Sequence, residues 1–290
     1  FNNGTVNEGG GIYTTSSGLT MHKSLVVGNT SGGAGAGIRA SGGVLNAINS
    51  IVWHNLRTNG SVDAWNGDKD GAYSNVESNT NAPWCDNCIN EAPLFLDWPN
   101  RDFNIPANSR CVNDGIPDSL DADGTPWDMG LYPHLNEYSG PGYYVDLETG
   151  NDVTGTGSVE SPFYSIQSAV NFALEPGDFV EVAPGEHVGN IFVENRSPDI
   201  YSTGGRDVTI LNGDSTGSVI TFMNVDSSAS LSSFTITNGS EWYNGYHIYG
   251  GGIYLSNADP LLTDLLIEDN NANHGAGIYA TYSEAVLDRS

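Results

Sequence analysis

The acidic segment at residues 113–128 carries the side chains best suited to bind a metal ion. It reads NDGIPDSLDADGTPWD and contains Asp114, Asp118, Asp121, Asp123 and Asp128. Calcium takes about six to eight hard oxygens, and Asp-x-Asp-Gly spacing lets one tight loop aim several at a cation. Carboxylates this close repel one another unless they are neutralised. We therefore predict a structural Ca²⁺ site here; the alternative is a solvated acidic turn capped by its own Asx hydrogen bonds.

A glycine-rich motif recurs along the chain and marks an internal repeat. It occurs as GGGIYT at 9–14, GAGIRA at 35–40, GGGIYL at 250–255 and GAGIYA at 275–280. Neighbouring copies lie 26 and 25 residues apart, a period typical of solenoids and propellers. Short β-rich runs separated by Gly, Asn, Ser and Asp fill each period. The pattern predicts an all-β fold, a parallel β-helix (β-solenoid) whose coils stack about 4.8 Å apart.

Alternation of side chains within the motif separates an inner from an outer face. The isoleucine of each copy points inward, and the residue after it points outward, at Tyr13, Arg39, Tyr254 and Tyr279. This outward stack is a candidate carbohydrate-binding surface, although mutual stabilisation of the ladder is the interpretation we favour. Asn29, Asn55 and Asn270 close comparable strands, where we expect hydrogen bonds from coil to coil.

The first half of the chain has the features of the C-terminal end of a β-helix, and the second half has those of the N-terminal end. At 161–178, SPFYSIQSAVNFALEPGD places Ser161 as N-cap and Pro162 at the first position of a short amphipathic helix. Such a helix would cap the open end of a β-helix. Residues 83–134 are irregular and rich in Pro and Asp, as a closing segment would be. The predicted β-helix is thus circularly permuted in this numbering.

This order divides the chain into three parts. Residues 1–134 form the C-terminal half of one β-helix with its closing segment, 135–142 are a linker, and 143–290 are the N-terminal half of the next β-helix with its capping helix. Placing Phe1 after Ser290 gives a coil of 24 residues beside neighbours of 25 and 26. The alternative is two unrelated half-domains in one fragment, which the 24-residue join makes the less favoured interpretation.

Closure of one chain on itself is strained. The connector at 133–142 reaches at most about 34 Å, whereas about eight or nine coils span about 38–43 Å. The predicted partner is therefore another copy, joined end to end from the Ser290 side to the Phe1 side. We favour near-identical domains in tandem along a longer chain over separate chains that assemble head to tail.

Three cysteines permit one disulfide and one spare thiol. Cys85 and Cys88 form a local bridge, or one of them pairs with Cys111; a lone Cys-x2-Cys has too few ligands for zinc. Asn-x-Ser/Thr sequons provide candidate glycosylation sites at Asn3, Asn29, Asn59, Asn195 and Asn238.

Composition excludes several classes of partner. Lys+Arg is 9 against Asp+Glu 35, so the formal net charge is −26, which excludes nucleic acid and a bare anionic membrane surface. No apolar run approaches the ~18 residues of a membrane span. Six Trp, fourteen Tyr and nine Phe argue against disorder despite the charge.

The Gly-Gly-x-Ile coils, SPFYSIQSAVNFALEPGDFVEVAPGEHVGNI at 161–191 and TITNGS at 235–240 resemble secreted right-handed parallel β-helix repeat proteins of the pectate-lyase-like superfamily. Some of these resemble polymorphic outer-membrane adhesins. The tail of 92–132 looks like the closing segment of such domains, and DGIPDSLDADG resembles thrombospondin type-3-like calcium repeats without the preceding Asp-x-Asp. The resemblance implies a right-handed β-helix and an extracellular or cell-surface location, and it says little about function.

Polysaccharide-active members of this superfamily suggest an enzymatic alternative. Polygalacturonase-like members combine paired aspartates, a His-Gly and a basic strand, but His274-Gly275 belongs to the repeat and has neither companion here. Pectate-lyase-like members need an Asp cluster beside an Arg base, and Arg39 has no such cluster in its own coil. We therefore expect a non-enzymatic structural repeat unit of an extracellular solenoid chain or filament. The alternatives are a glycan-binding adhesin module and a polysaccharide lyase or hydrolase.

Overall fold

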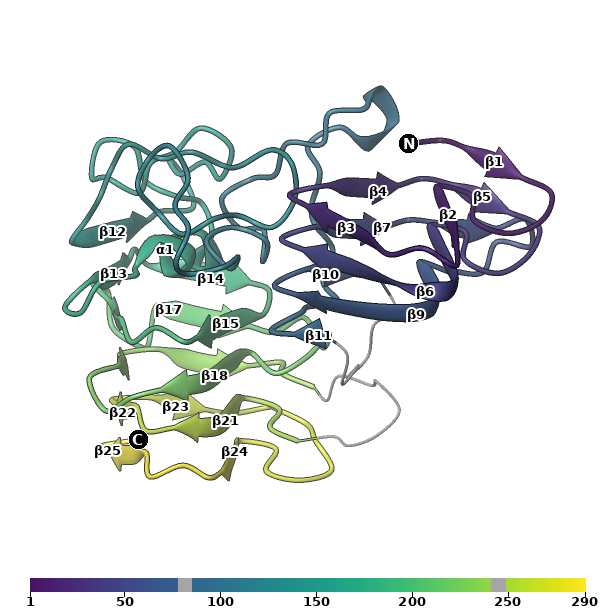
Figure 1. The fold of residues 1–290 in the computed structure, drawn as a ribbon. Helices are drawn as coiled ribbons and strands as arrows, with labels where there is room; N and C mark the ends of the chain where they lie inside the picture. Colours follow the sequence, from purple (N-terminus) through teal and green to yellow (C-terminus); the bar gives the residue numbers. More distant parts are fainter. Residues whose placement is uncertain (78–84, 241–248) are drawn as a thin grey trace. The chain divides into compact units, whose positions relative to one another are not determined.

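The computed structural model describes residues 1–77, 85–240 and 249–290. The chain divides into two compact units, Phe1–Leu135 and Asn136–Ser290. In the described residues, the sheets of both units are parallel, and helix is confined to one α-helix and one short 3-10 helix (Figure 1). The fold is therefore all-β, as predicted. Neither described helix is long and apolar enough to cross a membrane.

The strands of the second unit form three parallel sheets. The first sheet contains β12 (Gly142–Val145), β13 (Phe179–Val182), β16 (Asp199–Ser202), β19 (Ser230–Ser232), β22 (Leu261–Thr263) and β25 (Val286–Asp288). The second contains β14 (Gly185–Val188), β17 (Thr209–Asn212), β20 (Thr235–Thr237) and β23 (Leu266–Ile267). The third contains β15 (Ile191–Glu194), β18 (Ile220–Val225), β21 (Ile253–Ala258) and β24 (Ile278–Thr281).

From β13 onward, consecutive strands enter these three sheets in strict rotation, so each sheet gains one strand per repeat. We use "repeat" for the residues between equivalent positions of neighbouring strands in one sheet. The register aligns apolar side chains into columns, of which one runs Val180, Ile200, Leu231, Leu262 and Leu287. Its first four members are at most 1% exposed, whereas Leu287 in the last strand is 52% exposed. The core is thus continuous along the stack and open at β25.

Helix α1 (Ile166–Phe172) packs against β12, β13 and β15, and all its residues are buried. Its N-cap is Ser165, whose side chain accepts from the Ser168 N–H. The prediction of Ser161 as N-cap and Pro162 as first helical residue was wrong by four positions. The cause is Phe163, which forms a parallel β-bridge with Val145 and so is held in an extended conformation.

The first unit also consists of three parallel sheets, with strands of between 2 and 11 residues. Its strands are β1 (Gly4–Thr5), β2 (Ile12–Thr15), β3 (Leu19–His22), β4 (Leu25–Val27), β5 (Thr30–Ser31), β6 (Ile38–Ile48), β7 (Ile51–Trp53), β8 (Leu56–Arg57), β9 (Trp65–Ala72), β10 (Asn75–Val76) and β11 (Cys85–Asp86). The sheets are β1-β5-β8, β4-β7-β10 and β2-β6-β9-β11, and β3 pairs with β6 beside β2. The long strand β6 therefore pairs with both β2 and β3, the two separate strands of the preceding repeat.

Residues 93–134 form a closing segment without such a repeat. Its only helix is a 3-10 turn at Trp98–Asn100, and Ile105, Ala107, Val112 and Met129 are buried. Asn49 anchors this segment, because its side-chain oxygen accepts from the Ile116 N–H and its carbonyl accepts from the Gly130 N–H. A polar residue at the end of β6 therefore ties irregular chain to the repeats.

Candidate functional site

An asparagine ladder holds neighbouring repeats together in the first unit. The Oδ1 of Asn55 accepts both the backbone N–H and the side-chain amide of Asn29 at 3.0 and 2.9 Å. Asn29 Oδ1 accepts the same pair of bonds from Asn3, each at 3.0 Å. Asn29 and Asn55 are at most 1% exposed, so their polar groups are satisfied only by each other and the backbone. The predicted coil-to-coil bond between Asn29 and Asn55 is confirmed.

Asn270 occupies the corresponding position in the second unit. Its Oδ1 accepts from the Gly239 N–H at 2.8 Å, and its Nδ2 donates to the Ile236 carbonyl at 2.9 Å. The second glycine of the Gly-x-Gly-Ile motif lies beside this asparagine. A Cβ at Gly252 would lie 3.0 Å from Asn270 Nδ2, and a Cβ at Gly37 would lie 2.8 Å from Asn55 Nδ2. A backbone carbonyl lies closer still, 2.4 Å (Ala64) from a Cβ at Gly37 and 2.6 Å (Gly277) from one at Gly252, so a side chain at either glycine would meet both this backbone and the asparagine amide.

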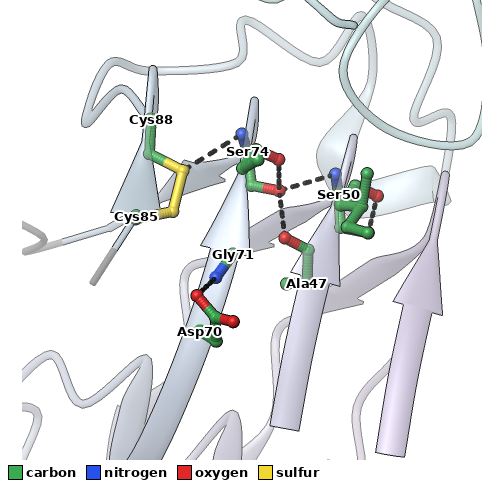
Figure 2. Close-up of a disulfide and its surroundings, with 9 residues drawn as sticks. Ala47, Ser50, Asp70, Gly71, Ser74, Cys85 and Cys88 are labelled. Carbon is green, nitrogen blue, oxygen red and sulfur yellow. Dashed lines mark hydrogen bonds between the residues drawn. A yellow bond between two sulfur atoms is a disulfide. The ribbon is translucent and has the colours of Figure 1, made fainter.

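A serine ladder runs beside it and was not foreseen from the sequence. Ser50 Oγ accepts from the Ser24 N–H at 3.2 Å. Figure 2 shows the next bond of the ladder, in which Ser74 Oγ accepts from the Ser50 N–H at 3.1 Å. Each of Ser24, Ser50 and Ser74 also donates its hydroxyl to the carbonyl two residues earlier. The signal was available: these serines follow the periods of 26 and 24 residues.

Each ladder serine follows a residue in the left-handed region. Lys23, Asn49 and Tyr73 have φ of 43°, 49° and 50°. In the second unit Arg289 has φ of 52° and precedes Ser290, whose Oγ accepts from the Leu265 N–H at 3.0 Å and donates to the Asp288 carbonyl. Ser290 therefore does in the last repeat of the second unit what Ser24, Ser50 and Ser74 do in the first.

The cysteines end this ladder. Cys85 and Cys88 are joined by a disulfide, and the Ser74 N–H donates to Cys88 Sγ at 3.3 Å, the place that a serine oxygen takes in the earlier repeats (Figure 2). Cys111 is a free buried thiol that accepts from Asn75 Nδ2. Burial raises the pKa of the Cys111 thiol to about 12, so it carries almost no thiolate near neutral pH.

The outward stack predicted at Tyr13, Arg39, Tyr254 and Tyr279 is divided between the units. Tyr254 and Tyr279 are register partners, and their rings stack at 5.8 Å with 9° between planes. Tyr249 also stacks on Tyr279, at 4.3 Å. Tyr13 pairs with Arg39, whose guanidinium instead contacts Glu8 at 3.1 Å and Asn66 at 2.6 Å.

This geometry bears on carbohydrate binding. Sugars stack on the open faces of aromatic rings. In the second unit the tyrosine faces cover one another, so ring stacking between repeats uses the surface that a sugar would need. Glycan binding at the stack stays a prediction, and ladder stabilisation is the role its contacts favour.

The carboxylates of the acidic segment have separate hydrogen-bond partners. Asp121 Oδ1 pairs with Lys23 Nζ at 2.6 Å, and its Oδ2 accepts from the Asp128 N–H at 2.8 Å. Asp123 caps its own turn through Thr125. Asp114 lies 3.8 Å from Arg110, and Asp118 is exposed.

Within residues 1–77, 85–240 and 249–290, no group of three or more metal-ligating side chains is gathered at one point. In this segment the backbone and two cations satisfy most of the carboxylate oxygens. The calcium site at these five aspartates stays a prediction.

Asp128 is the buried acid of this segment. Its two oxygens accept from the backbone N–H groups of Asn113 and His134 at 2.7 and 2.6 Å, and it is 1% exposed. Burial raises the pKa of Asp128 to about 7, and the charges of Asp121 and Asp123 act in the same direction while the two backbone bonds lower it. The carboxyl therefore changes charge near neutral pH while it holds both ends of the loop.

An aromatic cluster in the first unit was also missed. Phe95, Trp98 and Phe103 of the closing segment contact one another, and Trp98 and Phe103 also contact Phe1, with ring centroids 5.2–6.0 Å apart. His54 lies 4.9 Å from Trp98, and Arg101 lies over Phe1. The run of aromatic residues at 95–103 was the available signal. The cluster fastens the closing segment to the start of the chain.

The sequons differ in access. Asn29 is buried and its amide donates to Asn55, so the fold leaves no room for a glycan on it. Asn3, Asn59, Asn195 and Asn238 are exposed. Glycan attachment at these four positions stays a prediction.

The His274 ring, considered above for its His-Gly sequence, lies 5.3 Å from the Tyr249 ring at a tilt of 33°, and the two residues form a β-bridge. This is a structural contact of the repeat.

Comparison with protein-family models, with curated proteins and with solved structures found no match to the chain. The resemblance to pectate-lyase-like repeat proteins therefore stays a prediction from its motifs.

Proposed function

We propose that this chain is a structural module built as two parts of right-handed parallel β-helices, and that it serves as a rigid unit of an extracellular solenoid. The observation that carries the proposal is the rotation of β13 to β25 through three parallel sheets. Parallel strands joined in one sheet cross over with right-handed connections in nearly all proteins, which supports the right-handed winding.

Side-chain columns support a structural role. Apolar columns, the asparagine ladder and the serine ladder use the same positions in successive repeats, so each repeat is stabilised mainly by its neighbours. A protein built this way gains rigidity with every added repeat. The inner faces are filled by apolar side chains, as at Leu231 and Leu262, and the outward tyrosines contact one another.

The chemistry of the surface supports an extracellular or cell-surface location. The disulfide between Cys85 and Cys88 belongs to an oxidising compartment. A net charge of −26 keeps such a chain soluble and is screened in a salt-rich medium. Helix α1 is proposed to close the first end of the second unit, since it packs over the first strands of that unit.

X-ray diffraction from concentrated, aligned protein tests the proposal. A β-helix gives a strong reflection near 4.8 Å along the stacking axis, from coils at that spacing. The same preparation is incubated with uronate and neutral polysaccharides, and release of reducing ends or unsaturated sugars is followed. The proposal expects the reflection and no release. Absence of the reflection, or steady cleavage of any polymer, would overturn it, and binding on a glycan array without cleavage would replace it with the adhesin alternative.

A further inference from the structure

The second unit ends on strands whose outer side has no neighbour among the described residues. β24 and β25 are the last strands of their sheets. Side chains that are buried in earlier repeats are exposed here: Leu262 is 1% exposed, and its register partner Leu287 is 52% exposed. An apolar strand edge of this kind is a template for further pairing.

The first unit begins on strands of matching type. β2 and β3 both pair with β6, and the described residues supply no strand on their other side. The sequences of the two edges correspond: β24 is IYAT and β2 is IYTT. Ile and Tyr of each strand have the same facing, because Ile278 continues the column of Ile253 and Ile12 pairs with Ile38.

Four features, three of them in one stretch of four residues, agree on one register between these edges. Ile278 corresponds to Ile12 by the strand sequence, Leu287 to Met21 as the inward residue of the next strand, and Arg289 to Lys23 as the left-handed residue. Ser290 corresponds to Ser24 as the ladder serine. If Phe1 of a second copy is numbered directly after Ser290, the two residues of each pair are 24 positions apart. The neighbouring repeats have 25 residues (Ile253 to Ile278) and 26 residues (Ile12 to Ile38).

We infer that β24 and β25 form an interaction surface for β2 and β3 of a second copy of this chain, in the register Ile278–Ile12, Tyr279–Tyr13, Leu287–Met21 and Ser290–Ser24. The inference rests on the proposed β-helix and names its partner and register. Pairing extends the serine ladder, since the Ser290 N–H then donates to Ser24 Oγ as Ser24 donates to Ser50. Pairing also covers Leu287 and places Tyr13 on the tyrosine stack.

Charge is compatible with this register. In this register Asp288 lies opposite His22, and Arg289 lies opposite Lys23. Each of these two cations already has an ion-pair partner in its own chain: Arg289 lies 3.4 Å from Asp288, and Lys23 lies 2.6 Å from Asp121. The surface therefore brings no unpaired like charges together. The assembly is heterologous, with the tail of one copy on the head of the next, and it grows into a filament.

Cysteine pairing between two different variants tests the register. Tyr13→Cys is placed in one preparation and Tyr279→Cys in another, so that a disulfide forms only between chains. Neighbouring residues on parallel strands lie within disulfide reach, about 4.4–6.8 Å between Cα atoms. We expect cross-linked dimer at least about tenfold above that from Tyr13→Cys mixed with Thr281→Cys, which shares the outward face but lies two residues out of register. Equal yields, or no dimer from folded variants, would overturn the inference.

A second pair of variants tests whether the two copies associate, without introducing a disulfide between them. Leu287→Asp places a charge on the inward column, and Val286→Asp places the same charge on the adjacent outward residue, which is equally exposed. Analytical ultracentrifugation is expected to show assembly in the unchanged chain and in Val286→Asp, and monomer only in Leu287→Asp. Equal behaviour of the two variants would refute the inference. A 4.8 Å reflection from a protein that stays monomeric would reject the surface and leave the proposed β-helix standing.

Discussion

The two units use the same repeat and differ in how their ends are finished. The second unit begins under helix α1 and then adds strands to three sheets in strict rotation until β25. In the first unit β2 and β3 are edge strands among the described residues, and the chain passes after β11 into a closing segment bonded to Asn49. A stack of parallel strands leaves apolar side chains uncovered at each end. Helix α1 therefore packs over the first strands of the second unit, whereas the closing segment contacts several repeats of the first unit, at Lys23, Asn49 and Asn75.

The largest effect is expected from the centre of the second unit. Phe222 is fully buried between Val193 and Leu255 in an inward column. Phe222→Ala should lower the free energy of unfolding of this unit by about 3–5 kcal/mol, through lost burial and the cavity left behind. Scanning calorimetry should show this unit melting earlier and the first unit unchanged. Leu287→Ala, measured in monomer at the open end, should cost under about 1 kcal/mol; an equal cost would mean that this end is not open.

The next largest effect is a pH dependence of stability that we expect in the first unit, where Asp128 lies. Burial raises the pKa of Asp128 to about 7 in the folded first unit, from an ordinary value of 3.8. The folded state then binds the proton more tightly than the unfolded chain, so this contribution is complete below about pH 4 and is lost as pH rises through about 7. The first unit should lose about 2–4 kcal/mol of stability from this group between pH 4 and 8.

Asp128→Asn checks that assignment by thermal melts at several pH values. The amide keeps one acceptor oxygen, turns its NH2 toward the N–H that the second carboxylate oxygen accepted, and does not titrate. We therefore expect Asp128→Asn to be less stable at every pH, with a flatter slope of stability against pH for the first unit. A slope unchanged by the substitution would show that another group carries it.

A smaller effect compares the middle and the end of the serine ladder. Ser50→Ala removes the acceptor of the Ser24 N–H and a hydroxyl bond to the Ile48 carbonyl, at a buried position. We expect a loss of about 1–3 kcal/mol by denaturant unfolding. Ser290→Ala removes equivalent bonds beside solvent and should cost less. A larger loss at Ser290 would contradict the view that only interior repeats are fully desolvated.

The smallest effect concerns calcium at the acidic segment. Several of its carboxylate oxygens already accept from Lys23, Thr125 and backbone N–H groups, so any cation competes with these bonds. At calcium concentrations of one to ten times Kd, binding would stabilise the first unit by about 0.4–1.4 kcal/mol. Thermal melts with calcium and with a chelator measure the shift, and Asp118→Asn with Asp123→Asn serves as control. Identical melts in both buffers would remove the predicted site.

Several predictions from the sequence depended on local periodicity and agree with the structure. The Gly-x-Gly-Ile copies form register partners, as Ile253 with Ile278 and Ile12 with Ile38, because a fixed period places equivalent residues on neighbouring strands. Asn29 and Asn55 bond across repeats for the same reason. The helix was placed in the right region and began four residues late, since the bridge between Phe163 and Val145 comes from residues distant in sequence.

What the sequence determined by itself is the period: glycine at fixed positions of the motif, isoleucine on the inner face, and turn residues between short strands. These properties repeat within about 25 residues, so local chemistry is enough to show them. Only the tertiary structure decided how the aspartates of 114–128 divide among separate partners, which thiol stays free, and that Ser290 continues the pattern of Ser24. The repeat spacing indicates which serines correspond, but the bonds that each side chain makes depend on which backbone groups it meets after the repeats stack.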